Sequence, residues 1–284
     1  MFKVFADYHT HTLYSHGKGT VEENILAAKA RGLEEVAITD HGPGSAPWIR
    51  TTARQFHQIR KEADFYGHIY DDVKVLVGVE ANIMGMDGSL DLPREAVKDL
   101  DLLLVGYHPM VVPKSIKDAW KMYGRNCLAR YSRRAAEKAR VENTKALVEA
   151  VLRHDVDIVT HPGLNVSIDT AELARACARK GTALEINAGH GFMTPEFCRT
   201  AAREGARFVI NSDAHRPADV GRLERGIQVA VKAGLTADQI INAREERGLE
   251  RLAGESGQAR EPGGLQDPRE PPGARRPPGS RKEM

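Results

Sequence analysis

The segment FKVFADYHTH, residues 2–11, passes from strand-forming residues to polar residues within ten positions. Its β-branched and aromatic residues predict a strand over Phe2–Tyr8. His9 and His11 follow at positions i and i+2, so an extended chain places both imidazoles on one face. The segment therefore predicts a strand that delivers two potential metal ligands to the same side of a sheet.

The same alternation continues along the chain. Further short apolar runs predict strands at Glu35–Thr39, Val73–Glu80, Leu102–Tyr107, Asp157–Thr160, Ala183–Asn187 and Arg207–Asn211. Amphipathic stretches between most of them predict helices at Val21–Arg31, Arg54–Tyr66, Ala135–His154, Ala171–Arg179, Pro195–Arg203 and Val220–Ala233. Strands that alternate with helices and are apolar on both faces indicate a parallel α/β sheet. Because no GxGxxG follows the first strand, we expect a closed barrel and not an open dinucleotide-binding sheet.

Composition limits the class of protein. The chain has 284 residues, 41% of them hydrophobic, and its 41 basic and 39 acidic residues give a net charge of +2. This balance does not call for a nucleic-acid or membrane partner. There is no apolar run of about 18 residues for a membrane span and no signal-peptide core. Three cysteines without a CxxC pair indicate a reducing compartment. We therefore expect a cytoplasmic protein without disulfides.

The C-terminal part has a different composition. Residues 254–284 contain six prolines and six glycines among 31 residues, with almost no large apolar side chains. Such a segment cannot bury enough apolar surface to offset the entropy of ordering. We predict one domain over residues 1–250 and a disordered, Pro/Gly-rich tail over residues 251–284.

Polar residues gather where the predicted strands end. In a parallel α/β fold these carboxyl ends meet at one edge, where ligands and catalytic groups lie. Histidine makes up 11 of 284 residues, yet it follows five of the seven predicted strands. Any one of these histidines alone is better explained as a structural residue, but the joint pattern predicts a metal site. The candidate ligands are His9, His11, His16, His41, Glu80, His108, His161, Asp213 and His215.

The number of candidate ligands indicates more than one ion. Seven imidazoles and two carboxylates exceed the roughly four to six donors that one ion uses. Two ions fit, and three fit if water or substrate oxygens complete their shells. A histidine-rich shell favours zinc, iron or manganese over magnesium or calcium. Such clusters suit phosphate-ester hydrolysis by a metal-activated water, with Glu80 and Asp213 as the bridging and positioning carboxylates. No GxSxG nucleophile motif is present.

Six motifs carry a resemblance to a known family. They are His9-Thr10-His11-Thr12, Thr39-Asp40-His41-Gly42, Gly78-Val79-Glu80-Ala81-Asn82, Gly106-Tyr107-His108, His161-Pro162-Gly163 and Ser212-Asp213-Ala214-His215. Over about residues 1–250 the chain resembles the polymerase-and-histidinol-phosphatase (PHP) superfamily. The order and spacing of the six motifs are closest to those of its YcdX-like phosphatase branch. The resemblance implies a distorted (β/α)7 barrel with a trinuclear metal site, usually described with zinc.

The resemblance also implies a role for each ligand. His9 and His11 would hold one ion with Asp213, and Glu80 would bridge it to a second ion. His108 and His161 would complete the set of side chains that binds the second ion, and the third ion would be held by His16, His41 and His215. The loop after His11 is one residue shorter than in the bacterial phosphatase compared, so the reach of His16 decides how tightly the third ion is held.

Several other residues are candidates for supporting roles. We expect Asp7 and Asp40 to orient ligand imidazoles, with ordinary strand-end hydrogen bonding as the alternative. Glu185 and Asn187 could act similarly. Lys18, Lys114 and Arg216 follow ligand-bearing segments and either pair with phosphate or remain solvated. His57, His68 and His154 are expected on helix surfaces, and His190 in a loop near the rim, where substrate contact is the less favoured interpretation.

Four functions are compatible with these features. The leading one is hydrolysis of a small-molecule phosphate monoester, and histidinol-phosphate phosphatase is the second. Nucleic-acid processing is the third, since the basic stretch Lys114–Arg140 contains Tyr123 and Tyr131, although a solvated helix face explains it better. The fourth is a non-catalytic interaction domain, which the full ligand set disfavours.

Overall fold

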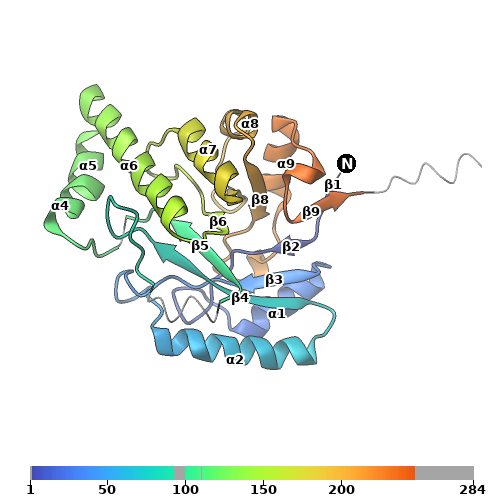
Figure 1. Cartoon of the computed structure of the whole chain (residues 1–284). Coiled ribbons are helices and arrows are strands. Elements are labelled where there is room, and N and C mark those ends of the chain that lie inside the picture. Colours follow the sequence, from blue (N-terminus) through green and yellow to red (C-terminus); the bar gives the residue numbers. More distant parts are fainter. Residues whose placement is uncertain (1, 93–99, 110, 247–284) are drawn as a thin grey trace, which may run out of the picture. The chain divides into compact units, whose positions relative to one another are not determined.

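Seven parallel strands form the centre of the computed structural model, which describes residues 2–92, 100–109 and 111–246 (Figure 1). They pair in chain order, from β2 to β8. The strands are β2 (Ala6–Asp7), β3 (Glu35–Ile38), β4 (Lys74–Asn82), β5 (Leu102–Gly106), β6 (Ile158–Val159), β7 (Ala183–Asn187) and β8 (Arg207–Asn211). Each lies within a predicted strand or extends it by two residues at most, which confirms the predicted parallel α/β architecture.

The first predicted strand is divided in two. β1 (Phe2–Val4) pairs antiparallel with β9 (Ala243–Glu245), whereas β2 joins the seven-stranded sheet. The change of partner takes place at Phe5, whose N–H donates to the carbonyl of Asn242 at 2.9 Å while its carbonyl accepts from the N–H of Glu34 at 2.7 Å. Pairing with a distant segment is not visible in a local pattern, and β9 was not predicted.

The sheet closes beyond the end of β2. Thr10 and Ala214 form a parallel bridge, in which the N–H of His11 donates to the carbonyl of Ala214 at 2.8 Å. The N–H of Ala214 in turn donates to the carbonyl of His9 at 3.2 Å. The first and last strands therefore meet, and the predicted (β/α)7 barrel is confirmed. It is distorted because β2 is only two residues long and its backbone pairs with β8 only beyond its end.

A buried side chain joins the two strands below that point. The amide of Asn242, which is 0% exposed, donates to the carbonyls of Ala6 at 2.8 Å and Ile210 at 2.7 Å. Its oxygen accepts from the N–H of Ile210 at 3.1 Å. Asn242 thus supplies hydrogen bonds that a longer β2 would have made with β8.

We expect Asn242→Ala to lower the free energy of unfolding by about 2–4 kcal/mol, because it removes three buried hydrogen bonds and leaves backbone groups unpaired. Urea unfolding followed by circular dichroism measures the loss. Gln58→Ala, at an exposed site on a helix, is the control and should change stability by no more than about 0.5 kcal/mol. Equal stabilities of the Asn242 variant and the wild type would contradict this account of barrel closure.

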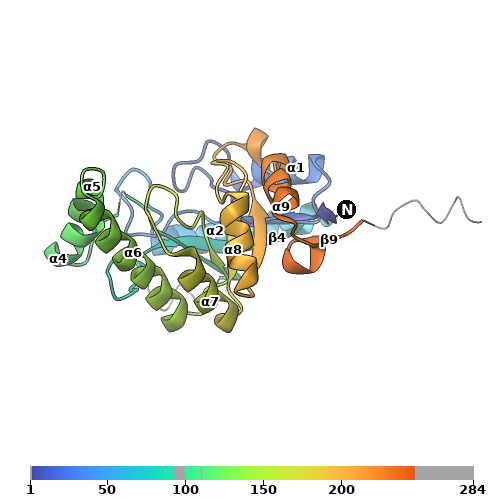
Figure 2. The same cartoon turned by 90° about the horizontal axis from the view of Figure 1, so that it is seen from above.

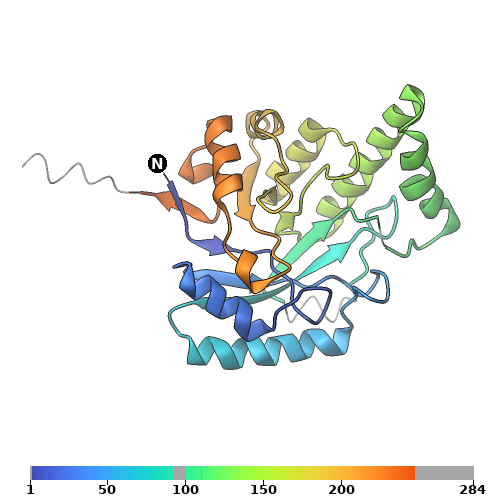
Figure 3. The same ribbon diagram turned by 180° about the vertical axis from the view of Figure 1, so that it is seen from behind.

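Helices cover the outer surface of the strands. α6, α7, α8 and α9 follow one another along one side, and α1 and α2 lie on the opposite side (Figures 1 and 3). Seen from above, the strands lie behind α6, α7 and α8 (Figure 2). The α-helices are α1 (Val21–Ala30), α2 (Ala53–Ile69), α4 (Ile116–Ala119), α5 (Arg125–Leu128), α6 (Arg133–Arg153), α7 (Thr170–Lys180), α8 (Pro195–Arg203) and α9 (Glu224–Ala233). The six predicted helices are confirmed.

Two stretches of helical structure differ from the prediction. The predicted helix Val220–Ala233 begins at Glu224 instead, because Gly221 has a φ of +71° and follows the short 3-10 turn η2 (Pro217–Asp219). Between β5 and α6 the chain forms α4, the π-helical turn η1 (Trp120–Gly124) and α5. The sequence indicated only a basic, amphipathic stretch there.

The barrel interior is apolar at one end and polar at the other. One buried cluster inside the strands consists of Ala6, Tyr8, Ala37, Leu104, Ile158, Ala183 and Val209. Because side chains alternate along a strand, the next inward positions toward the carboxyl ends are polar, among them Thr39, Glu80, Glu185 and Asn211. The apolar cluster thus forms a floor that supports a polar upper layer, as expected for a barrel with its site at the carboxyl ends.

Two sequence predictions concern other parts of the chain. The predicted tail over residues 251–284, and the domain boundary at residue 250, lie outside the described residues. Among the helices of the described ranges, none has the length and apolar composition that crossing a membrane requires.

Candidate metal centre

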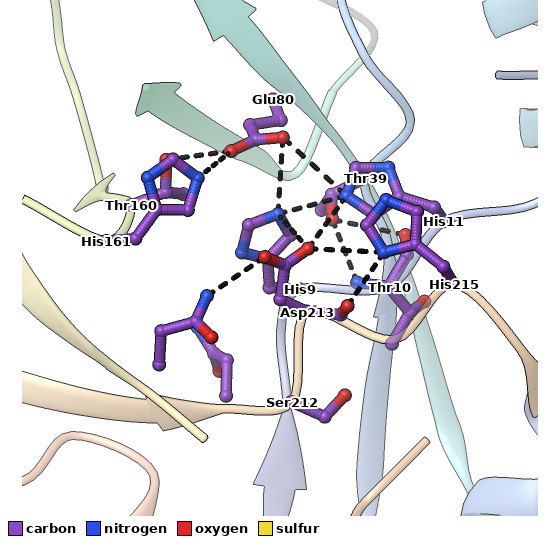
Figure 4. A network of polar contacts seen from close by, with 12 residues as sticks. His9, Thr10, His11, Thr39, Glu80, Thr160, His161, Ser212, Asp213 and His215 are labelled. Carbon is purple, nitrogen blue, oxygen red and sulfur yellow. Dashed lines mark hydrogen bonds and ion pairs between the residues drawn. The ribbon is translucent and has the colours of Figure 1, made fainter. Parts of the chain in front are cut away.

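All nine predicted ligands lie together at the carboxyl ends of the strands. His9 and His11 are 0% exposed. The other seven line a cavity of about 160 Å³ above them: His16, His41, Glu80, His108, His161, Asp213 and His215. Figure 4 shows the inner part of this network, with Glu80 facing imidazoles that come from opposite sides of the barrel. The structure therefore brings together every residue that the sequence singled out as a ligand.

One group of four donor atoms has the dimensions of a metal site. Nε2 of His9 and Nε2 of His11 are 3.1 Å apart, and Oε2 of Glu80 lies 3.3 and 3.6 Å from them. Oδ1 of Asp213 lies 3.5 and 3.3 Å from the same two nitrogens. The edge of a tetrahedron around zinc is about 3.3 Å for metal–ligand bonds of about 2.0–2.1 Å. These four side chains could hold one ion.

A second group lies on the other oxygen of Glu80. Oε1 is 3.1 Å from Nε2 of His108 and 3.0 Å from Nε2 of His161, and these two nitrogens are 3.3 Å apart. The hydroxyl of Thr160 also donates to Oε1, at 2.8 Å. Since each oxygen of Glu80 faces a different set of imidazoles, this carboxylate is placed to bridge two ions.

A third group consists of imidazoles on the open side of the cavity. The ring of His16 stacks on that of His41 with centroids 4.9 Å apart, and it lies 4.2 Å from the ring of His215. His11, His41 and His215 have ring nitrogens within 4.8 Å of one another. The loop after His11, although short, therefore brings His16 to the cluster.

Hydrogen bonds fix which nitrogen of several rings carries the proton. Nδ1 of His9 lies 2.7 Å from Oε1 of Glu185, and Nδ1 of His108 lies 2.8 Å from the side-chain oxygen of Asn82. Nδ1 of His215 lies 2.9 Å from the carbonyl of Asp213. A neutral imidazole that donates through Nδ1 has its lone pair on Nε2. For His9 and His108 that nitrogen faces the oxygens of Glu80, at 3.3 and 3.1 Å, which is favourable only when a proton or a metal ion lies between them.

The pKa values of the cluster indicate where positive charge is favoured. Burial opposes protonation of His9, but Asp213, Glu185 and Glu80 outweigh it and hold the pKa of His9 well above its ordinary value. Burial and the neighbouring His215 and His41 lower the pKa of His16 to about 4, so its ring is neutral near pH 7. The centre thus combines carboxylates that attract positive charge with neutral imidazoles that can donate lone pairs. Its donor set fits divalent transition-metal ions.

Glu185 is the hub of the hydrogen bonds beneath the cluster. Oε1 faces Nδ1 of His9 and accepts from Nδ2 of Asn211 at 3.0 Å. Oε2 accepts from the N–H of His161 at 2.7 Å and from Nδ2 of Asn187 at 3.0 Å. Asn187 also donates to Oδ2 of Asp213 at 3.0 Å. The supporting roles suggested for Glu185 and Asn187 match these contacts.

Asp7 and Asp40 support the backbone and not the imidazoles. The carboxylate of Asp7 accepts from the N–H and hydroxyl of Ser212 at 3.1 and 2.5 Å, and from the N–H of Gly221 at 2.8 Å. Asp40 accepts from the N–H and hydroxyl of Thr12 at 2.7 and 2.5 Å, and from the hydroxyl of Ser15. The prediction that these two aspartates orient ligand rings is therefore wrong in its contacts. The observed bonds are those of the strand-end alternative.

The backbone at two ligands also departs from expectation. A residue before proline is usually extended, yet His161, which precedes Pro162, has a φ of +29°, and Asp213 has a φ of +55°. Both values lie in or near the left-handed region that non-glycine residues rarely adopt. Hydrogen bonds to the N–H of His161 and the carboxylate of Asp213 offset this strain. Backbone of this kind gathers at functional sites, and here it occurs at two of the nine candidate ligands.

The basic residues and histidines outside the ligand set differ in how well their positions were predicted. Lys114 pairs with Asp87, outside the cavity, while Lys18 and Arg216 are exposed and do not line it. His57 and His68 are exposed, as predicted. His190 is closer to the centre than expected, with Nε2 3.2 Å from Oδ2 of Asp213. Its place after the strand-end Asn187 was the one signal that could have identified it.

Comparisons with known proteins agree with this geometry. A family model described as PHP domain matches residues 7–254. A "Probable phosphatase" of Acetivibrio thermocellus is 30% identical over 86% of this chain and 93% of its own length. Another of Shewanella frigidimarina is 31% identical, over 86% of this chain and 91% of its own length. The fold is similar to that of a histidinol phosphate phosphatase from Lactococcus lactis, solved with zinc, L-histidinol and phosphate. That similarity has a TM-score of 0.56 at 16% identity and covers 81% of this chain and 94% of the other.

Proposed function

Because this chain belongs to the PHP domain family, we propose that it hydrolyses small-molecule phosphate monoesters at a centre of three metal ions. Membership makes it a metal-dependent phosphoesterase, and the proposal adds the number of ions, their ligands and the substrate class. The observation that carries it is the convergence of imidazole nitrogens on both oxygens of Glu80 at 3.0–3.6 Å.

Each ion would have its own set of side chains. His9, His11 and Asp213 would hold the first, and His108 and His161 the second, with Glu80 shared between them. His16, His41 and His215 would hold the third. We propose zinc for all three, with manganese or iron as alternatives that the same donors accept.

Bound divalent ions supply acidity to water and offset the charge of a phosphate ester. The chain's own residues position these effects. Glu185 and Asn82 fix the rings of His9 and His108, and Asn187 holds the carboxylate of Asp213. The amide of Asn82 is itself fixed, because its Nδ2 donates to Asp91 at 2.6 Å and to Ser45 at 2.8 Å. Such bonds prevent the rings from rotating when substrate enters.

The size of the cavity supports a small substrate. Its volume of about 160 Å³ is below the roughly 300–1,000 Å³ of typical ligand sites, so it fits a phosphoryl group and little else. The rest of the ester would bind outside it. Histidinol phosphate is the alternative substrate, since a histidinol phosphate phosphatase shares the fold.

The basic stretch between residues 114 and 140 gives little support to nucleic-acid processing. Lys121 and Arg125 both pair with Glu142, and Arg140 pairs with Asp169 at 2.7 Å. Cations that are already paired release fewer counterions when they meet a phosphate backbone. We therefore retain the small-molecule proposal.

We expect the purified protein to contain about three transition-metal ions per chain, as two tight sites and a third histidine site would require. It should hydrolyse p-nitrophenyl phosphate, lose activity when dialysed against a chelator, and recover it with zinc or manganese. Elemental analysis and the rate of nitrophenol release are the measurements. Histidinol phosphate and single-stranded DNA, assayed in parallel, distinguish the alternatives. One ion per chain would refute the trinuclear proposal, and hydrolysis of DNA alone would refute the substrate class.

A further inference from the structure

A larger chamber adjoins the metal centre. It has a volume of about 840 Å³ and shares His16, His190, Asp213 and His215 with the smaller cavity. Its far wall is formed by the first turn of α9 and the turn before it, which contribute Asp219, Arg222, Glu224 and Arg225. We call it the side chamber. A substrate whose phosphoryl group occupies the smaller cavity could extend directly into it.

The charges on that wall leave one cation unpaired. Nη1 of Arg222 lies 2.8 Å from the carboxylate of Asp219, and Glu224 faces Nη1 of Arg31 at 4.0 Å. Arg225 has no hydrogen bond or ion pair to any residue in the described parts of the chain. Because each carboxylate on the wall already has its own arginine, the wall carries one surplus positive charge at Arg225.

The guanidinium of Arg225 packs against a glycine. It lies against Gly191, where an added Cβ would come within 2.1 Å of Cζ of Arg225. Gly191 has a φ of +66°, so the loop after β7 both turns at this residue and leaves space for the guanidinium. Arg225 is exposed and has no partner among the described residues, so its donors are available to a ligand that enters the side chamber.

The boundary between the two spaces is His190. Its side chain is 52% exposed, and Nε2 contacts Asp213, one of the proposed metal ligands. His190 directly precedes Gly191, the glycine against which Arg225 lies. Two consecutive residues of the loop after β7 therefore reach both spaces: His190 contacts Asp213 at the metal centre, and Gly191 lies against Arg225 in the side chamber.

We propose that the side chamber binds a second anionic group of the substrate, a phosphate or a carboxylate, through Arg225. This inference rests on the proposed function and specifies its substrate class: phosphate monoesters that carry a further negative charge. Arginine suits this role because its planar donors engage a phosphate or carboxylate with two parallel hydrogen bonds. The alternatives, a neutral or cationic leaving group, are outcomes of the test.

The binding test uses non-hydrolysable probes on the zinc-loaded protein. Alkylphosphonates, ω-carboxyalkylphosphonates and α,ω-alkanebisphosphonates of matched and increasing chain length are titrated by calorimetry. We expect the second anion to tighten binding by about tenfold or more at the chain length that reaches Arg225. The bisphosphonate and carboxyl series together show which anion is preferred.

Variants assign the effect to one residue. Arg225→Ala should abolish the advantage of the second anion, and Arg225→Lys should keep part of it because charge remains without the two-pronged geometry. Arg203→Ala, at an exposed arginine of α8, is the matched control and should keep the full advantage. Equal affinities for singly and doubly charged probes, or an advantage that survives Arg225→Ala, would overturn the proposal.

Kinetics separate this inference from the function on which it rests. The ratio of kcat/KM for a sugar bisphosphate to that for p-nitrophenyl phosphate should fall by about tenfold in Arg225→Ala. If the wild type hydrolyses neither ester, the proposed function fails. If it hydrolyses both and the ratio is unchanged by the substitution, only the anion subsite fails.

Discussion

Glu80→Gln is expected to lower kcat/KM for p-nitrophenyl phosphate by about a thousandfold or more, which corresponds to about 4 kcal/mol of lost transition-state stabilisation. The reason lies in the contacts of its two oxygens. Oε2 faces His9, His11 and His41, and Oε1 faces His108 and His161. Glutamine offers one oxygen and one amide group, so one set of imidazoles would face N–H donors instead of a shared anion.

Metal content provides a second readout of the same substitution. Elemental analysis of Glu80→Gln should show the loss of at least one ion per chain, because a bridging carboxylate is a ligand of two ions. Glu172→Gln, in the first turn of α7, is the control: Glu172 does not line the cavity, and the variant should retain both metal and activity. A Glu80→Gln enzyme with wild-type rate and metal content would show that Glu80 does not bridge ions.

The barrel and the meeting of the nine candidate ligands at one end of it could be predicted from the sequence, because both depend on local patterns. The alternation of apolar runs and amphipathic stretches marks strands and helices, and parallel strands bring their carboxyl ends together. Residues such as His9 and Asp213, 204 positions apart, could therefore be placed in one site without knowledge of their contacts. The position of each strand end was sufficient to predict which side chains meet in the cavity.

The contacts that the sequence did not reveal depend on side chains that meet only in the folded protein. Asn242 lies on a segment with no motif, and its role follows from the gap between β2 and β8 that it fills. Arg225 is one exposed cation among many in the sequence, and it is distinguished only by its seat over Gly191 and its lack of a partner in the described residues. Local rules identify which residues can bind metal, whereas unpaired charge and cavity shape are properties of tertiary structure.

The same limit explains the error over the supporting aspartates. Asp7 precedes His9 by two residues, so its position on the strand suggested contact with the ligand's ring. In the folded chain, Ser212 and Gly221 occupy its hydrogen-bonding sites, and the distant Glu185 reaches the ring of His9 instead. A side chain on the right face can still lie one layer below the rings, and sequence spacing does not distinguish the layers.

Glu185→Gln is expected to weaken metal binding by about 10–100-fold without removing a proposed ligand, the range typical of a lost partner to a ligating histidine. Glu185 is 0% exposed, and its two oxygens are surrounded by four nitrogens, those of His9, His161, Asn187 and Asn211. Glutamine has a single oxygen, so its amide group must face at least one of these N–H donors. When the amide group faces His9, the ring loses its acceptor, and the opposite orientation leaves the N–H of His161 without one.

Competition with a chromogenic chelator measures the affinity of each ion in this variant and in the wild type. We expect the ion held by His9 and His11 to be released first, because Glu185 contacts the ring of His9 directly. The ion held by His108 and His161 should be affected less, because Glu185 reaches His161 only through its backbone N–H, and the third ion least, because none of the hydrogen bonds of Glu185 reaches His16, His41 or His215. A structural role alone would weaken all ions together in proportion to the lost stability, which thermal unfolding of the metal-free protein measures separately. Selective loss of one ion would therefore show that the carboxylate acts through the ring of His9, and uniform loss, or none, would contradict that assignment.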